Sequence, residues 1–190
     1  RNTGDAELRA MAERGGVVGI IFWPYLRTQG QPMASDVIRH IEHALDVCGE
    51  DHVGIGTDGT VSPTERTAQF EKANRAYIDA MRLDDTFGKG RAPGLYAFIP
   101  DLNRVDRFAV LGGLLSTRGH SDTRIAKILG GNFARVMGEV WPAARRHVAA
   151  ELGSGDPSAI VFAANTHDFL IRLAAAAPRG DPRRLRVLTS

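Results

Sequence analysis

The stretch VVGIIF at residues 17–22 and the stretch HVGIG at residues 52–56 decide the fold of this chain. Each is a nearly continuous apolar run of strand length, which is typical of strands buried on both faces of a parallel sheet. Between them, residues 36–48 carry apolar side chains at helical spacing, and Gly49 ends the pattern. A strand, a helix and a strand joined by short linkers form a right-handed crossover. The sequence therefore predicts an α/β fold with parallel strands.

Helical periodicity also appears outside this unit. Gly4 can begin a first helix as its N-cap, because Glu7 lies three residues on and can reach back to it. Apolar residues recur every three or four positions in three longer segments. They predict helices over residues 64–83, 104–117 and 122–141.

Pro142 marks a change of pattern. A proline lacks the backbone donor and clashes with the preceding turn, so we expect it to break the helix over residues 122–141. We therefore place a boundary near residue 142, with one segment at residues 1–141 and a small α/β segment at residues 142–190. The small segment is predicted to contain a helix at 145–152, a turn at 153–157, a strand at 159–163, a helix from Asn165 and a strand at 185–189.

The composition excludes several classes of function. Twenty-four Lys and Arg against 22 Asp and Glu leave a formal charge of +2, with no run of five like charges. This balance does not indicate a nucleic-acid or membrane surface, and no apolar run approaches the roughly 18 residues of a membrane span. The single Cys48 cannot form an internal disulfide and lies on an apolar helix face. A buried thiol of this kind fits a reducing compartment, and we expect a cytoplasmic location.

Asp58 is the strongest catalytic candidate by position. It follows the second predicted strand and lies between Gly56 and Gly59. Catalytic groups collect at the carboxyl ends of parallel strands, because the loops there converge over the sheet. An Asp-Gly pair is also ordinary turn chemistry, so a turn without catalytic function stays open.

Two histidines have a spacing that metal sites use. His40 and His43 lie at i and i+3 on the predicted helix over residues 36–48, and paired imidazoles can bind zinc. No Cys, Asp or Glu in a companion position completes a set of three or four ligands. We therefore interpret both as surface histidines and predict no metal ligand from spacing.

Several separated stretches, in this order, resemble the membrane (renal) dipeptidase family, zinc metallopeptidases with a TIM-like barrel. The resemblance covers residues 1–141 and implies the C-terminal portion of a partial (β/α) barrel. The strands ending at Phe22 and Gly56 would be its seventh and eighth, and residues 125–141 would form a closing helix. The stretches are Arg1-Asn2 before a helix, LRAMAERGGVVGIIF, DVIRHIEHALDVCGEDHVGIGTD and IAKILGGNFARVMGEVW.

The resemblance also implies site residues. Arg1, with Asn2 beside it, matches the family arginine that binds the substrate carboxylate, a task suited to a guanidinium fork. Asp58 matches the family aspartate that takes part in proton transfer near two zinc ions. The family reads Asp-Phe-Asp-Gly where this chain has TDGT at residues 57–60, and the loop or insertion at residues 84–101 is unusual. The family's metal-binding His, Asp and Glu residues precede the arginine, so we expect this chain to lack most ligands of a binuclear zinc centre.

The tail at residues 142–190 resembles a different family, the N-terminal part of class V aminotransferases and kynureninase-like pyridoxal-phosphate enzymes. The stretches that carry this resemblance are RRHVAAELGSGDPSAIVFAANTHDFLIRL and RLRVLTS. Asn165-Thr166 would lie at a strand-to-helix junction, where backbone amides can receive a phosphate or simply cap a helix. The tail contains no lysine for a Schiff base.

These observations leave three hypotheses. The first is hydrolysis of dipeptides at a binuclear zinc site, with this chain expected to be a piece of a longer protein and inactive without an N-terminal half. The second is a non-catalytic fragment that forms homo-oligomers or binds a partner, since a quarter of a barrel leaves strand edges unpaired and apolar surface uncovered. The third is a part of a pyridoxal-phosphate enzyme.

Overall fold

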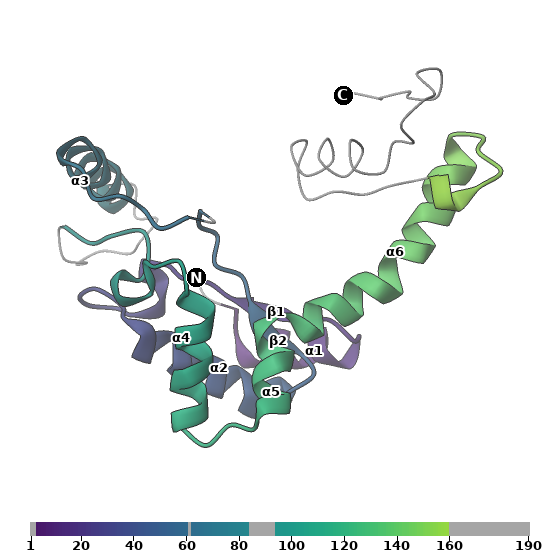
Figure 1. Cartoon of the computed structure of the whole chain (residues 1–190), viewed down its shortest axis with the longest axis horizontal. Coiled ribbons are helices and arrows are strands. Elements are labelled where there is room, and N and C mark those ends of the chain that lie inside the picture. Colours follow the sequence, from purple (N-terminus) through teal and green to yellow (C-terminus); the bar gives the residue numbers. More distant parts are fainter. Residues whose placement is uncertain (1–2, 61, 84–93, 160–190) are drawn as a thin grey trace. The chain divides into compact units, whose positions relative to one another are not determined.

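The computed structural model describes residues 3–60, 62–83 and 94–159 (Figure 1). The chain divides into two compact units, Arg1–Met137 and Gly138–Ser190. Predictions that concern Arg1, Asn2 and residues 160–190 lie outside the described residues. The division falls between Met137 and Gly138, whereas the sequence places a boundary near residue 142.

The predicted strand–helix–strand unit is confirmed in the first unit. Strands β1 (Val18–Ile20) and β2 (Val53–Ile55) pair in parallel, with Val18 opposite Val53, and α2 (Ala34–Cys48) connects them. The strands are shorter than the apolar runs that predict them. In the described residues the sheet has these two strands, so the described part is an α/β unit with a small parallel sheet, and its place in a barrel stays a prediction.

Helices account for most of the remaining described residues. The N-cap prediction for the first helix is confirmed, because the backbone N–H of Gly4 donates to Glu7 Oε2 over 2.7 Å. Among the described residues, none of the helices combines the length and the hydropathy needed to cross a membrane. The helices are α1 (Asp5–Glu13), α3 (Ala68–Leu83), α4 (Arg107–Thr117), α5 (Asp122–Ala126) and α6 (Asn132–Glu151), with single turns η1 (Pro24–Leu26), η2 (Pro100–Leu102) and η4 (Pro157–Ala159).

The predicted break at Pro142 is wrong. Helix α6 continues through Pro142 to Glu151. It therefore includes most of the residues 145–152 that were expected to form a separate short helix. A proline inside a helix removes one hydrogen bond of the ladder, at a cost of about 3 kcal/mol, and the turns on either side can keep theirs.

The break occurs earlier, at Gly130. Its φ of 156° and ψ of −21° are not helical, and the π-type turn η3 (Lys127–Gly131) separates α5 from α6. Glycine accepts this conformation without the clash that a Cβ atom would cause. The single predicted helix over residues 122–141 is therefore two helices joined by a turn.

The main hydrophobic core lies between the sheet, α2 and α4. Val37 and Ile41 of α2 are fully buried, as are Val53 of β2 and Leu111 and Leu115 of α4. Apolar area removed from water stabilises a fold by roughly 25 cal/mol per Å². This core is the main source of cohesion in the first unit. Its other buried members are Ile20, Phe22, Leu26, Ala34, Ile38, Ala44, Ile99, Leu102 and Ile128.

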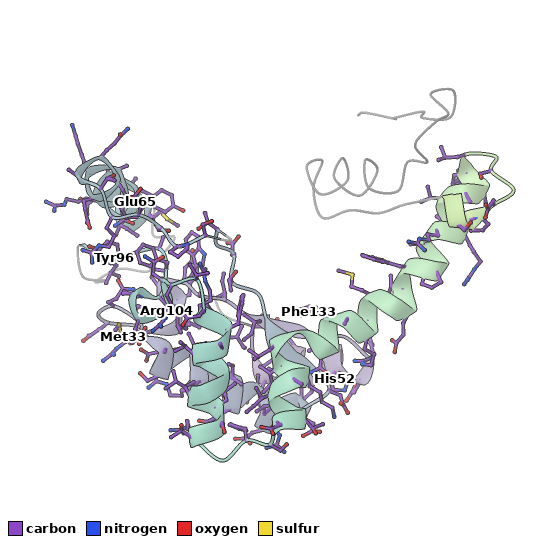
Figure 2. All side chains as sticks on the ribbon, in the orientation of Figure 1. Met33, His52, Glu65, Tyr96, Arg104 and Phe133 are labelled. Atoms are coloured by element: carbon purple, nitrogen blue, oxygen red, sulfur yellow. The ribbon has the colours of Figure 1, made fainter. Side chains whose placement is uncertain are left out.

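Glycines let α6 approach the sheet closely. Phe133 lies at the start of α6 (Figure 2). A Cβ atom on Gly54 would lie 2.5 Å from Cε2 of Phe133, and one on Gly19 would lie 3.1 Å from the backbone of Gly56. The aromatic ring thus occupies the space that a side chain at residue 54 would need. The absence of a side chain at Gly54 and Gly19 therefore allows Phe133 to pack against the two strands.

Asn132 connects the start of α6 to the loop that leads into β2. Its side chain is 3% exposed, and its Nδ2 donates to the backbone carbonyls of Glu50 over 2.7 Å and Val53 over 2.8 Å. The Glu50 carboxylate accepts from Arg124 Nε over 2.9 Å and Lys127 Nζ over 2.6 Å. The lysine and arginine hydrogen bonds lower the pKa of Glu50. Polar contacts therefore hold α5, η3 and α6 against the start of β2.

The N-terminus of α2 is held by a distant carboxylate. The backbone N–H of Ala34 donates to both oxygens of Asp101, at 3.0 and 3.1 Å. Gln31 adds a second connection, since its Nε2 donates to the carbonyl of Phe98 over 3.0 Å and its Oε1 accepts from the N–H of Tyr96 over 2.7 Å. Residues 96–101 are thereby attached to the segment that precedes α2.

A bidentate ion pair joins α2 to the end of α4. Arg118 donates from Nε to Oε1 of Glu42 over 2.6 Å and from Nη2 to Oε2 over 2.7 Å. The hydrogen bonds from Arg118 lower the pKa of Glu42. Paired geometry of this kind is the strongest form of a surface ion pair.

Substitution of Gly54 by Ala tests the contact with Phe133. We expect the free energy of unfolding to fall by about 1–3 kcal/mol, because the added methyl group overlaps the ring. In a Phe133→Ala background the same substitution should cost much less. Urea denaturation of the four proteins of this double-mutant cycle measures both values. An equal loss of unfolding free energy in the two backgrounds would contradict the contact. The control is Gly113→Ala, whose added Cβ atom meets no atom within 4 Å.

Substitution of Glu42 by Gln tests the ion pair through its pH dependence. The folded-state pKa of Glu42 is lowered, so its contribution is present above the usual glutamate pKa and is lost as the pH falls through the lowered value. We expect wild type to exceed Glu42→Gln by about 0.5–1 kcal/mol at neutral pH, and the difference to shrink in acid. Urea denaturation at a series of pH values measures it, with the exposed Glu13→Gln as control. A difference that stays constant with pH would exclude the pairing.

Candidate functional site

A cavity of about 330 Å³ opens where β1 and β2 end. Phe22 reaches it just after β1, and Thr57 and Thr60 reach it just after β2. The rest of the wall comes from α3 with the residues before it, and from residues 97–107. The carboxyl ends of parallel strands are where ligand sites form in α/β folds, so this cavity is the candidate site.

Asp58 lies at the edge of this cavity. Its neighbours Thr57 and Gly59 line the cavity, and Asp58 itself is exposed. Its φ of 48° is in the left-handed region, which aspartate tolerates better than most residues. The predicted position of Asp58 after the second strand is confirmed, and its part in proton transfer stays a prediction.

Trp23 connects Asp58 to α3. The indole Nε1 donates to the backbone carbonyl of Asp58 over 3.2 Å. The Trp23 ring also meets Tyr77 of α3 edge to face, with 6.5 Å between the ring centroids. The Trp23 side chain therefore contacts both the loop after β2 and α3, the helix that forms one wall of the cavity.

His40 and His43 have separate partners. His40 Nε2 lies 2.8 Å from the carbonyl of Leu26, and His43 Nε2 lies 2.8 Å from Oδ1 of Asp5 on α1. Within residues 3–60, 62–83 and 94–159, no three His, Cys, Asp or Glu side chains are grouped so that they could hold a metal ion. Arg1 and Asn2, the predicted substrate-binding residues, lie outside the described residues, as do Asn165 and Thr166.

Two polar side chains in the wall are buried. Arg107 is 9% exposed and donates from Nη1 to the carbonyl of Thr60 over 3.2 Å and from Nε to that of Arg104 over 3.1 Å. Asn74 is 8% exposed and donates from Nδ2 to the carbonyl of Leu95 over 2.9 Å. The bonds to Thr60 and Leu95 run between segments distant in sequence and hold the wall together.

Neither Asn74 nor Arg107 stands out in the sequence by motif. A weak signal exists for Asn74, which lies four residues after Phe70 and four before Ile78, on the apolar face of α3. A polar side chain at a core position requires a hydrogen-bond partner. The sequence does not show that the partner is the carbonyl of Leu95.

Aromatic rings dominate one side of the site. The Phe98 ring stacks on Tyr96 with 5.0 Å between centroids, and its centroid lies 6.1 Å from that of Phe70 of α3. Arg66 lies over the Tyr96 ring at 4.5 Å and donates from Nε to Oε1 of Glu71 over 2.8 Å. The Arg66 hydrogen bond lowers the pKa of Glu71, while burial and the Glu71 carboxylate raise the pKa of Tyr96. This network orders the outer rim of the cavity.

Comparison with known proteins identifies relatives of this chain. Residues 1–73 match the family model described as membrane dipeptidase, peptidase family M19. The chain is 30% identical over 152 residues to Dipeptidase ataJ of Aspergillus terreus, which covers 78% of this chain and 29% of that protein. It is 29% identical over 147 residues to a Klebsiella pneumoniae protein described as an uncharacterized protein in the pqqA 5′ region, covering 74% of this chain and 41% of that protein.

A solved structure is also similar to this chain. An amidohydrolase from Pseudomonas aeruginosa is 26% identical, with a TM-score of 0.53 over 74% of this chain and 41% of that chain. The chain spans between 29% and 41% of the length of the curated relatives described above. Residues 1–73 are therefore similar to the membrane dipeptidases of peptidase family M19.

Proposed function

We propose that this chain is part of a metal-dependent dipeptidase and supplies groups that position and protonate a dipeptide substrate. The match of residues 1–73 to the membrane dipeptidase family model carries this proposal. The 30% identity to Dipeptidase ataJ supports it over a longer stretch. The reaction class is hydrolysis of a peptide bond.

Two residues of this chain have assigned roles in the proposal. Arg1 binds the substrate carboxylate, with Asn2 beside it, because a guanidinium presents two parallel donors to a carboxylate. Asp58 transfers a proton at the reacting amide. The exposure of Asp58 at the rim of the strand-end cavity supports this role, since a proton-transfer group must reach its substrate.

The described residues do not fit a binuclear zinc centre by themselves. His40 and His43 contact a carbonyl and a carboxylate in different parts of the unit, and Asp58 has no second metal donor grouped with it among the described residues. A zinc centre of this family would need donors from elsewhere in the protein, where bound zinc activates a water molecule. The part played by this chain is confined to substrate positioning and proton transfer.

The association alternative has its own support. Within the described residues, β1 and β2 form a two-stranded sheet, so each pairs through one edge. Val105 and Phe108 near the start of α4 are 85% and 45% exposed. Unpaired strand edges and exposed apolar residues favour association with another chain. The pyridoxal-phosphate alternative concerns residues that lie mainly outside the described part of the chain.

A chimera tests the proposed function. Residues 1–141 of this chain would replace the matching region of Dipeptidase ataJ, and hydrolysis of a dipeptide would be measured with and without a chelator. We expect chelator-sensitive hydrolysis by the chimera and none by this chain alone. Asp58→Asn in the chimera should lower kcat by about 10²- to 10⁴-fold, the usual contribution of a proton-transfer group.

The matched control is Asp46→Asn, an exposed aspartate on α2 that should leave kcat unchanged. Equal activity of the Asp58→Asn chimera and its parent would remove Asp58 from the mechanism. A folded but silent parent chimera would overturn the proposed function itself.

A further inference from the structure

The strand-end cavity has four aromatic walls that come from three parts of the chain. Phe22 follows β1, Phe70 and Tyr77 belong to α3, and Phe98 precedes η2. We call this cavity the aromatic pocket. Phe22 is buried, Phe70 and Phe98 are half-buried, and Tyr77 is 45% exposed. Apolar surface thus remains open to solvent inside a concave site, which is the usual character of a small-ligand pocket.

The size of the aromatic pocket restricts its occupant. Its volume of about 330 Å³ lies at the lower end of the roughly 300–1,000 Å³ that ligand pockets span. One amino-acid side chain with its neighbouring backbone fits such a space, and an extended peptide does not. Aromatic rings prefer ring partners in offset-stacked or edge-to-face contact, which four aromatic walls can supply.

Charge in the wall selects against a cationic side chain. Of the lining residues that the structure describes, Arg107 is charged and none carries a carboxylate. A lysine or arginine side chain in the aromatic pocket would therefore meet the guanidinium of Arg107 and no carboxylate among the described lining residues. A neutral apolar side chain meets no such penalty.

The position of the aromatic pocket links it to the proposed chemistry. Thr57 and Gly59, the neighbours of Asp58, line it, so an occupant lies beside the exposed aspartate. Part of its wall is formed by residues 97–99.

We propose that the aromatic pocket binds the aromatic side chain of a dipeptide and so sets the substrate preference of the site. The choice of a dipeptide rests on the proposed function. The choice of an aromatic side chain rests on the rings, the volume and the absence of a carboxylate among the described lining residues.

Titration calorimetry on this chain tests the proposal with three probes, Gly-Phe, Gly-Gly and Gly-Lys, all in the presence of a chelator. We expect Gly-Phe to bind at least about tenfold more tightly than the other two, the scale on which an apolar pocket discriminates side chains. Gly-Phe binding no tighter than Gly-Gly or Gly-Lys would overturn the proposal.

Two variants of α3 locate the binding. Ala73 lines the aromatic pocket, and Ala73→Leu should fill it and weaken Gly-Phe binding by at least about tenfold. Ala76→Leu places the same side chain on the same helix at a residue outside the pocket lining, and it should bind as wild type does. Unchanged binding by a folded Ala73→Leu, or equal weakening by both variants, would show that the ligand binds elsewhere.

Amide chemical shifts of the wild-type chain keep the proposal testable if Ala73→Leu does not fold. Gly-Phe should move the resonances of Thr60, Ala73 and Phe98 more than those of Ala76, and the opposite pattern would overturn the proposal. Since the titration measures binding without hydrolysis, its failure and the failure of the proposed function can be told apart. A silent chimera would remove the dipeptidase assignment and leave a Gly-Phe site in place.

Discussion

The burial of one face of α2 against β1 and β2 is the constraint on which the first unit depends. Val37 and Ile41 are fully buried there, and the helix also spans the distance that a parallel crossover must cover. Because the crossover makes the two strands parallel, both end at the same edge of the sheet. The loops after Phe22 and Gly56 then meet, and the aromatic pocket and Asp58 lie where they meet. The position of the candidate site therefore follows from the packing of α2 against the sheet.

Local features of the fold could be predicted from the sequence because their causes are local. The apolar runs around Val18 and Val53 can bury both faces, and the Gly4 cap is satisfied by Glu7 three residues away. The predicted break at Pro142 is wrong because its cause is not local. The prediction considered one residue, whereas the hydrogen bonds of the other turns keep α6 continuous through Pro142. The true interruption at Gly130 depends on a backbone conformation that glycine permits but does not require.

The candidate site could be predicted only in part. The strand-end position of Asp58 follows from the strand pattern, but the cavity beside it is assembled from segments far apart in the chain. Phe22 and Phe98 line the same cavity as α3 through tertiary packing that no periodicity encodes. The burial of Arg107 depends in the same way on the carbonyl of Thr60. Non-local contacts of this kind leave almost no trace in a single sequence.

The attachment of residues 96–101 to α2 has a consequence for motion. Asp101 and Gln31 bind this wall to the start of the best-buried helix, whereas Ile78 of α3 belongs to a separate small cluster with Leu95. Segments with few buried contacts open locally at lower free energy than the core. We therefore expect amide hydrogens of α3 to exchange with solvent faster than those of α2. On this expectation the cavity has one side, residues 96–101, attached to the core, and one side, α3, that opens at lower free energy.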